Sequence, residues 1–333
     1  MQTSKPSSRS RPGIFLRFFQ HGDRPWQGIL ILIAALVIIL MLAVGGMLWV
    51  QSAGARIKFG WSFLTPTANP NWDPVNDNFQ AWPFLFGTLL TSIFAILFAL
   101  PIGLGIAIFL AELCPAWLRT PLTWMVELLA AIPSVIYGLW GIFVFLPKVV
   151  APVGVFLGNS LGKIPILGDV FAGPIPASGA SRLAASLILT IMIIPTIAAV
   201  SRDVFLAIPG AQREASKALG ATEWETIWQV LIPYGRSGIL GAVILGLGRA
   251  LGETMAVTMV IGNSIQGGVS LLQPGYSMAS IIANEFAEAV SPLHTSALLE
   301  IGLILFVITL LLNIVARFLV WQVGRQTPQE ARV

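Results

Sequence analysis

Charged side chains are scarce in this sequence. Asp, Glu, Lys and Arg together make up 10% of the 333 residues, against roughly 25% in soluble proteins. Hydrophobic residues make up 56%, and the mean hydropathy is +0.84. A composition this poor in charge excludes a soluble globular domain and predicts an integral membrane protein.

Residues that form disulfides or hold metals are almost missing. The single cysteine, Cys114, excludes an internal disulfide and a thiolate metal cluster. The two histidines, His21 and His294, lie far apart in the sequence and lack the spacing of metal ligands. We therefore expect no metal site, no bound cofactor and no catalytic residues, because an intramembrane enzyme needs a nucleophile with its base or a metal set.

A nucleotide-binding loop is missing as well. The one look-alike, residues 158–164 (GNSLGKI), has three residues between its glycines instead of four. It also ends in Ile, where a Ser or Thr hydroxyl would hold magnesium. The chain is therefore expected to have no ATPase of its own, and any ATP-driven step requires a partner chain.

Six hydrophobic segments are long enough to cross a membrane as helices. The first has 22 uncharged residues, which exceeds the roughly 7–15 of a signal peptide, so we expect it to be retained. Pro101 and Pro133 are expected to kink the second and the third segments. The sequence thus predicts an all-α membrane protein with spans at residues 29–50, 84–111, 120–147, 183–200, 237–262 and 296–316.

The basic residues indicate the orientation of these spans. The two termini, the 112–120 turn and the 201–236 loop contain thirteen Lys and Arg residues, whereas segments 51–82, 148–182 and 263–293 contain five. Because Lys and Arg accumulate in cytoplasmic loops, both termini are predicted to be cytoplasmic. The same distribution explains the pI of 9.6 without nucleic acid as a partner. The expected parts are a cytoplasmic tail (1–27), a first transmembrane helix (28–50), an extracytoplasmic loop (51–82), a five-helix core (83–322) and a second tail (323–333).

The polar loop 201–236 carries the most specific short pattern. Its helix-prone first half and Gly220 predict a short helix that ends at residue 220, and Thr222 with Glu225 has the spacing of a capping box for the next helix. Such a helix–turn–helix below the membrane suits a groove on a soluble partner. It also fits an interfacial helix pair that only joins two spans. The residues expected to couple to a partner are Glu214, Ala215, Ser216, Gly220, Val230, Ile232 and Pro233.

The fifth span contains two charges. Arg249 lies 13 residues after Arg236, which places it about 20 Å into a bilayer core of ~30 Å, and Glu253 is expected one turn later on the same helix face. Charges at this depth cost roughly 2.5–3.5 kcal/mol each and therefore face protein or water. An arginine fork suits phosphate or sulfate oxygens, and Glu253 would neutralise it when no anion is bound. A salt bridge that only fastens the span to a neighbour stays open as an alternative.

Glu127, near the start of the third span, is a weaker candidate for the substrate path. It is expected about two turns inside the cytoplasmic end, where an acid either reaches the interface or pairs with a loop arginine. The candidate path residues are therefore Arg249, Glu253 and Glu127.

Several stretches together resemble one known family. They are residues 87–92 (GTLLTS), 111–113 (AEL), Glu127 with 132–138 (IPSVIYG), and 248–257 (GRALGETMAV). The loop also resembles the EAA loop of ABC-importer permeases, E-A-A-x3-G-x9-I-x-L-P, with every spacing kept and with Ser216, Val230 and Ile232 as mild substitutions. The resemblance covers roughly residues 30–320 and is to the PstC-type permeases of the bacterial high-affinity phosphate importer.

The resemblance implies a type I importer in the bacterial inner membrane, with the MetI-like fold in spans two to six. It also implies a heterodimer with a PstA-type permease, two PstB-type ATPase subunits that bind ATP and magnesium, and an extracytoplasmic PstS-type phosphate-binding protein. It links Arg249 and Glu253 to phosphate translocation and the 201–236 loop to the ATPase.

Two other functions stay open at this point. A permease for another oxyanion, such as sulfate or molybdate, would show the same arginine. A secondary transporter or channel that uses an ion gradient often has two internal repeats, and the charged motif of span five has no second copy in the sequence.

Overall fold

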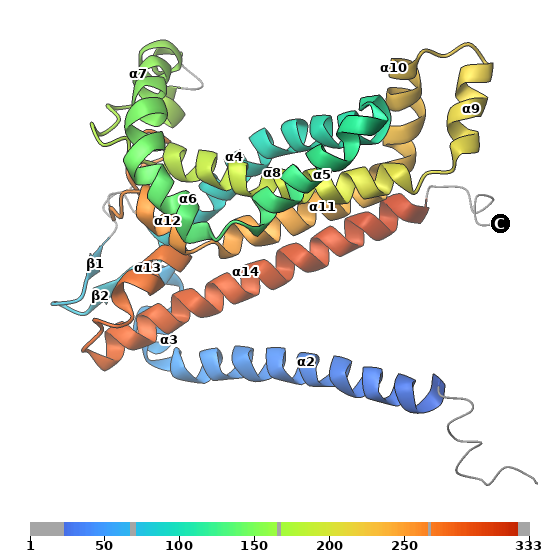
Figure 1. Ribbon diagram of the computed structural model, residues 1–333. Helices are drawn as coiled ribbons and strands as arrows, with labels where there is room; N and C mark the ends of the chain where they lie inside the picture. Colours follow the sequence, from blue (N-terminus) through green and yellow to red (C-terminus); the bar gives the residue numbers. More distant parts are fainter. Residues whose placement is uncertain (1–22, 67–70, 165–167, 266–267, 326–333) are drawn as a thin grey trace, which may run out of the picture. The chain divides into compact units, whose positions relative to one another are not determined.

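The computed structural model describes residues 23–66, 71–164, 168–265 and 268–325 (Figure 1). Most of the predicted tails 1–27 and 323–333 lie outside these residues. The chain divides into two units, residues 1–50 and 51–333. In the first unit, helix α2 (Asp23–Gln51) is apolar all round, and residues Trp26–Gln51 of it are long and hydrophobic enough to span a membrane.

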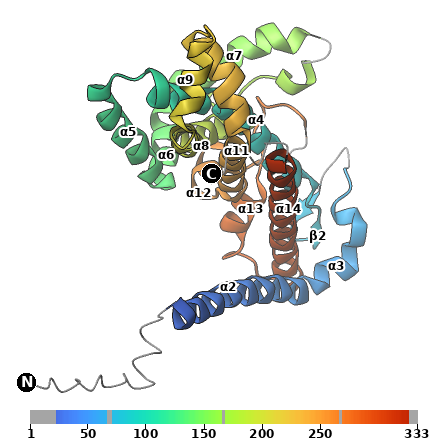
Figure 2. The same ribbon diagram turned by 90° about the vertical axis from the view of Figure 1, so that its right-hand side faces the viewer.

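The second unit is a helical bundle built around α8 (Arg182–Leu206). Two-thirds (67%) of the apolar window of α8 is buried, against 22–33% in the other candidate spans of this unit. Helices α4 (Trp82–Ile108), α11 (Ile232–Gly252) and α14 (Pro292–Arg325) complete the long elements (Figure 2). With α2 and the helical run Ser134–Lys163, the described residues provide six helices long and apolar enough to cross a membrane. The predicted all-α fold with six spans is confirmed.

Shorter elements connect the long helices. They are α3 (Ala53–Phe59), η1 (Gly60–Phe63), η2 (Phe109–Leu113), α5 (Ala116–Ala131), α6 (Ser134–Trp140), η3 (Gly141–Val150), α7 (Ala151–Ser160), η4 (Leu161–Lys163), η5 (Gly168–Phe171), α9 (Gly210–Ala218), α10 (Glu223–Thr226), η6 (Ile227–Leu231), α12 (Met255–Val260) and α13 (Met278–Glu285). Strands β1 (Trp72–Asp73) and β2 (Asn78–Phe79) form an antiparallel hairpin with Trp72 opposite Phe79.

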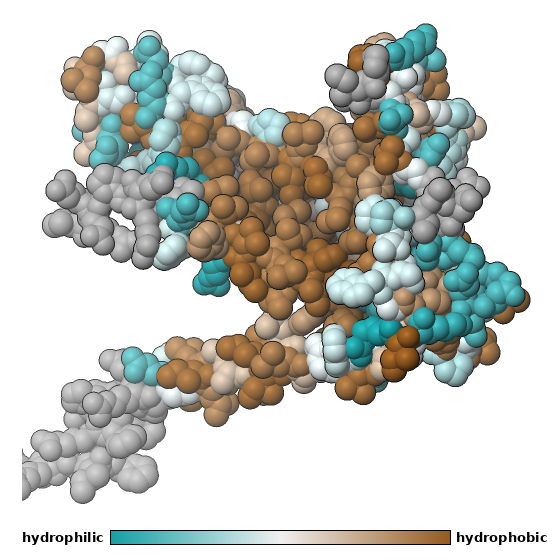
Figure 3. Space-filling view, turned by 180° about the vertical axis from the view of Figure 1, so that it is seen from behind, coloured by the Kyte–Doolittle hydropathy of each residue, from teal (hydrophilic) through white to brown (hydrophobic). Residues whose placement is uncertain are grey.

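The two ends of this bundle differ. Helices α9 and α10 project from one end, whereas α7, α13 and the β1–β2 hairpin lie at the other (Figure 1). The helices between them present a continuous hydrophobic band, and the polar side chains gather at the two ends (Figure 3). A band of this kind is the surface that lipid tails require.

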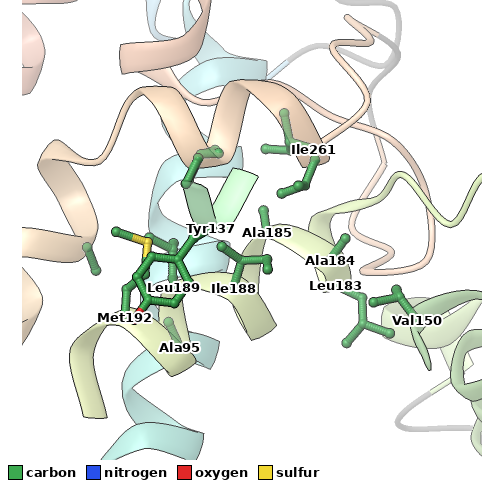
Figure 4. Packing of buried hydrophobic residues seen from close by; sticks show 14 of the residues in the cluster. Ala95, Tyr137, Val150, Leu183, Ala184, Ala185, Ile188, Leu189, Met192 and Ile261 are labelled. Carbon is green, nitrogen blue, oxygen red and sulfur yellow. The ribbon is translucent and has the colours of Figure 1, made fainter. Parts of the chain in front are cut away.

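Small residues allow α8 and α11 to approach closely. A Cβ added at Gly238 would meet the side chain of Val204, and one at Gly246 would meet Ile197. On another face of α8, Ile188, Leu189 and Met192 pack with Tyr137 of α6 and Ala95 of α4 (Figure 4). This dense packing fixes the register of α8 against its neighbours.

The predicted third span, 120–147, is wrong in its bounds. Helix α5 ends at Ala131, Ile132 is extended, and Pro133 precedes a new helix. The continuous apolar helix runs from Ser134 to Lys163, so the first part of segment 148–182, which the sequence predicted to connect two spans, is helical. Lys148 lies within this helix, where its long basic side chain can extend to a polar boundary.

The predicted fifth span, 237–262, is also wrong in its bounds. The helix begins earlier, as a helical run over Glu223–Gly252, and it stops at Gly252. Glu253 is extended, with φ −71° and ψ 122°, and a separate helix α12 starts at Met255. Helix α8, which corresponds to the predicted fourth span 183–200, extends to Leu206.

One close contact in the bundle makes a testable prediction. A Cβ at Gly87 of α4 would collide with the backbone oxygen of Tyr276, and the next residue, Thr88, accepts a hydrogen bond from the Met278 amide at 2.8 Å. Gly87→Ala must therefore push the 276–278 segment away from α4, at a cost of about 1–3 kcal/mol. We expect a lower thermal unfolding midpoint for the detergent-purified protein. Gly105→Ala is the control, because a Cβ there meets nothing within 4 Å; an equal midpoint for the two variants would contradict the close contact.

Candidate functional site

Helices α9 and α10 form a compact helix–turn–helix, which we call the elbow (residues 210–226). Gly220 ends the first helix with φ +88°, a conformation that favours glycine. Thr222 then caps α10: its hydroxyl accepts from the Glu225 amide at 3.2 Å, and the Glu225 carboxylate accepts from the Thr222 amide at 2.8 Å. The predicted helix end and capping box are confirmed.

Arg213 fastens the elbow to the bundle. Its Nη2 lies 2.7 Å from the carboxylate of Glu112, a residue of η2, which directly continues α4. The same guanidinium donates to the backbone oxygens of Ile208 and Phe205, each at 2.7 Å. Both side chains of this ion pair are largely buried, where a charge-assisted pair is stronger than at the surface. The elbow is therefore tied to the end of α8 and cannot swing independently of it.

Further contacts hold the two elbow helices together. The hydroxyls of Ser216 and Thr226 lie 3.0 Å apart, and Lys217 pairs with Glu223 at 2.9 Å. A preorganised elbow loses little conformational entropy when it binds a partner.

The outer surface of the elbow is hollowed, and apolar and polar side chains line the hollow together. Leu219 is 90% exposed at the tip. Beside it lies an open hollow lined by residues that include Ala215, Ser216, Gly220 and Val230. Of the other predicted coupling residues, Glu214 is exposed on α9, while Ile232 and the exposed Pro233 begin α11 just beyond η6. The structure thus brings four of the seven predicted residues to one hollow.

Glu127 lies apart from the other two predicted path residues. Its side chain, on α5, is 53% exposed and faces Arg202 of α8, with 3.6 Å between Oε1 and Nη1. Arg202 belongs to segment 201–236, which the sequence predicted as a loop. The sequence offered two alternatives for Glu127, and the structure shows the second one, a pair with an arginine of this segment. Arg202 is six residues, about 9 Å along α8, from the residue that Arg249 contacts.

Arg249 lies in the last turn of α11, half-buried against α8. Its Nη1 donates a 3.4 Å hydrogen bond to the Thr196 hydroxyl. Across the described part of the chain, the other guanidinium N–H groups have no protein acceptor. Such a guanidinium is available to bind an anion with both arms of its fork.

The sequence predicted Glu253 one helical turn beyond Arg249 on the same helix face, and this prediction is wrong. The α11 helix ends at Gly252, and the Glu253 carboxylate turns to accept a 3.2 Å hydrogen bond from the Ala256 amide at the start of α12. In the residues that the structure describes, no ion pair joins Glu253 to Arg249. A glutamate satisfied by a helix start does not neutralise the arginine.

Two helix breaks and an internal proline lie in Arg249's own helix and in the helices packed on α11 and α12. Pro133 separates α5 from α6, and the Tyr137 hydroxyl donates at 2.8 Å to the oxygen of Leu129, the carbonyl that a residue at 133 with an N–H would have bonded. Pro195 precedes Thr196 within α8, and the α11–α12 break follows Arg249. Inside a membrane, irregular backbone is found where it is buried in protein or lines a polar path.

Four residues that make contacts in this region were not predicted from the sequence: Thr196, Tyr137, Arg202 and Arg213. Pro195 next to a hydroxyl residue inside an apolar span was the one available signal for Thr196. The Arg213–Glu112 pair joins residues 101 positions apart, and nothing in a single sequence indicates such a pair.

Comparison with known proteins identifies the class of this fold and site. Residues 103–325 match the family model described as "binding-protein-dependent transport system inner membrane component". The chain belongs to this family.

Two curated relatives define the family more closely. The phosphate transport system permease protein PstC of Mesorhizobium japonicum is 44% identical over 327 residues, with 98% of both chains covered. PstC of Haemophilus influenzae is 48% identical, over 87% of this chain and 90% of that protein. The chain is therefore a member of the PstC-type permeases, a class of transport subunits and not of enzymes.

Solved structures share the fold at low sequence identity. One, of a bacterial ABC transporter involved in the import of the polysaccharide alginate, has a TM-score of 0.57, is 17% identical and covers 94% of this chain and 100% of its own. Another, of the MetNI methionine ABC transporter in an inward-facing conformation, has a TM-score of 0.51, is 19% identical and covers 71% and 93%. These similarities confirm the MetI-like permease fold.

Proposed function

We propose that this chain is the membrane-spanning subunit of an ATP-driven importer of inorganic phosphate. The observation that carries the proposal is 44% identity, over nearly the whole chain, to a phosphate transport permease. A half-buried arginine with unused donors, set among interrupted helices, supports an oxyanion as the cargo.

In this proposal the elbow receives the ATPase. The hollow beside Leu219 accepts a side chain of a PstB-type subunit, and ATP and magnesium stay on that partner. The elbow end of the bundle and both termini then face the cytoplasm, in agreement with the distribution of basic residues. A PstA-type permease completes the path, and a PstS-type protein delivers phosphate at the end with the β1–β2 hairpin.

Arg249 binds the anion inside the path with its fork. Glu253, as long as it caps α12, keeps its negative charge off the arginine and does not compete with phosphate. When the path is empty, Glu253 would leave the cap and pair with Arg249, which precedes it by four residues in the chain. Alternation of this kind keeps phosphate binding weak enough for release, which conduction requires. Glu127 remains a proposed path residue at the cytoplasmic approach, where its pair with Arg202 would open.

Uptake of radiolabelled phosphate by cells with and without this chain tests the proposal. We expect uptake to depend on the chain and on ATP, and excess unlabelled phosphate to compete while sulfate and molybdate do not. Stronger competition by sulfate or molybdate would replace phosphate as the cargo. Transport by the purified chain alone, without an ATPase, would refute the importer mechanism. Co-purification from native membranes identifies the companion subunits.

A further inference from the structure

Among the described residues, Thr196 does not make the hydrogen bond to its own helix that several threonines of the neighbouring helices make. Inside a helix, a threonine hydroxyl usually donates to a backbone oxygen one turn earlier. Thr88, Thr91, Thr190 and Thr258 all do so, to Phe84, Gly87, Ser186 and Thr254, at 2.7–2.8 Å. For Thr196, the part of the chain that the structure describes offers one hydrogen bond only, and there the hydroxyl is the acceptor.

The partner in that hydrogen bond is Arg249. Its Nη1 donates to the Thr196 oxygen at 3.4 Å, across the interface between α11 and α8. The close packing at Gly246 and Gly238 holds the two helices in this register. A hydroxyl that accepts from a cation still has its own hydrogen to donate. That hydrogen has no protein acceptor among the described residues.

We propose that Thr196 is a second anion-binding residue of the path, acting together with Arg249. The guanidinium takes two oxygens of a tetrahedral oxyanion, and the Thr196 hydroxyl donates to a third oxygen while its own oxygen stays bonded to Arg249. Three donors from two helices match the shape of hydrogen phosphate better than the fork alone. The inference rests on the proposed phosphate transport, and it assigns a specific role to one hydroxyl of α8.

The arrangement also makes the site sensitive to movement between helices. Arg249 is on α11 and Thr196 is on α8, so a small displacement of one helix removes one of the three donors without breaking either helix. The anion is then held tightly in one conformation and loosely in the other, which is the differential binding that alternating access requires.

The test is to remove the hydroxyl and keep the shape. The complete transporter, purified with its companions and reconstituted in liposomes, is compared as wild type, Thr196→Val and Thr196→Ser. The readout is the number of phosphate ions moved per ATP hydrolysed, together with the thermal unfolding midpoint. We expect Thr196→Val to lower phosphate per ATP about tenfold or more, the effect of losing a hydrogen bond to a charged group. ATP hydrolysis and the midpoint should stay near wild type, and Thr196→Ser should restore the ratio.

Thr190→Val is the matched control on the same helix. Thr190 donates to Ser186 and, at 3.3 Å, to the Ala95 oxygen of α4, so its hydroxyl has a packing role. Its loss should lower the unfolding midpoint and leave phosphate per ATP unchanged. If Thr196→Val behaves in the same way, or transports like wild type, the hydroxyl has only a structural role and the inference is wrong. Arg249→Leu, measured in parallel, separates the two proposals. Normal phosphate transport by Arg249→Leu would refute the proposed path itself. Loss of transport in Arg249→Leu together with normal transport in Thr196→Val would refute only the role of Thr196.

Discussion

Arg249→Leu is expected to abolish phosphate uptake while the complex still assembles and hydrolyses ATP. Leucine fits the apolar surroundings of α11, so the fold gains an apolar side chain and loses a charge that is costly inside a membrane. What disappears is a fork of two charge-assisted hydrogen bonds to the anion. Two such bonds correspond to a loss of about a hundredfold or more in binding. The measurement is the initial rate of phosphate uptake, normalised to the amount of complex in the membrane.

Arg249→Lys is the control for charge without the fork. Lysine keeps the positive charge but presents it as a point instead of a planar pair of donors. We expect partial uptake, well above the leucine variant and below wild type. Uptake by Arg249→Leu at the wild-type rate would mean that Arg249 is a structural residue that only fastens α11 to α8 through Thr196.

Gly220→Asp is expected to detach or uncouple the ATPase. Aspartate is among the residues that tolerate a positive φ, so the backbone at φ +88° is only mildly strained. The larger effect is a second negative charge in the hollow, which Glu225 already lines, at a place where it would have to be buried against the partner. The amount of ATPase that co-purifies with the permease should fall sharply, and phosphate uptake should fall with it.

Gly210→Asp introduces the same charge on the same elbow. Gly210 begins α9, and a Cβ there meets nothing within 4 Å. An acid at the start of a helix is favourable, so this variant should co-purify and transport normally. A Gly220→Asp variant that retains both its ATPase and its uptake would show that the hollow is not the docking site.

The sequence predicted the parts of the fold that depend on local chemistry. Long apolar runs gave the six spans, and the capping residues Thr222 and Glu225 gave the start of α10, because caps are set within a few residues. Counting from Arg236 placed Arg249 within the fifth span, and α11 carries it in its last turn. Its depth in the bilayer stays a prediction. These predictions needed no knowledge of which helices touch.

The predictions that failed depended on tertiary packing. The helix break at Gly252 is stabilised by the Glu253 carboxylate at the start of α12, and a periodic pattern that runs on past residue 253 gives no sign of it. Ser134–Lys163 continues as one helix through Lys148 because a long side chain tolerates that position. The meeting of Thr196 with Arg249 depends on the register of two helices, which is set by side chains distant in sequence.

The attachment of Arg213 has a mechanical consequence. Of the two backbone oxygens it holds, that of Phe205 is in the last turn of α8, and that of Ile208 lies two residues after the helix ends at Leu206. Thr196 is on the same rod, nine residues before Phe205, or about 14 Å away. Helix α8 is continuous between these two points. In the proposed importer, a movement of the elbow would therefore pass along α8 to Thr196 and would shift one proposed anion donor relative to the other. The helix tied to the proposed ATPase docking site would then also be the helix whose movement weakens the binding of the anion.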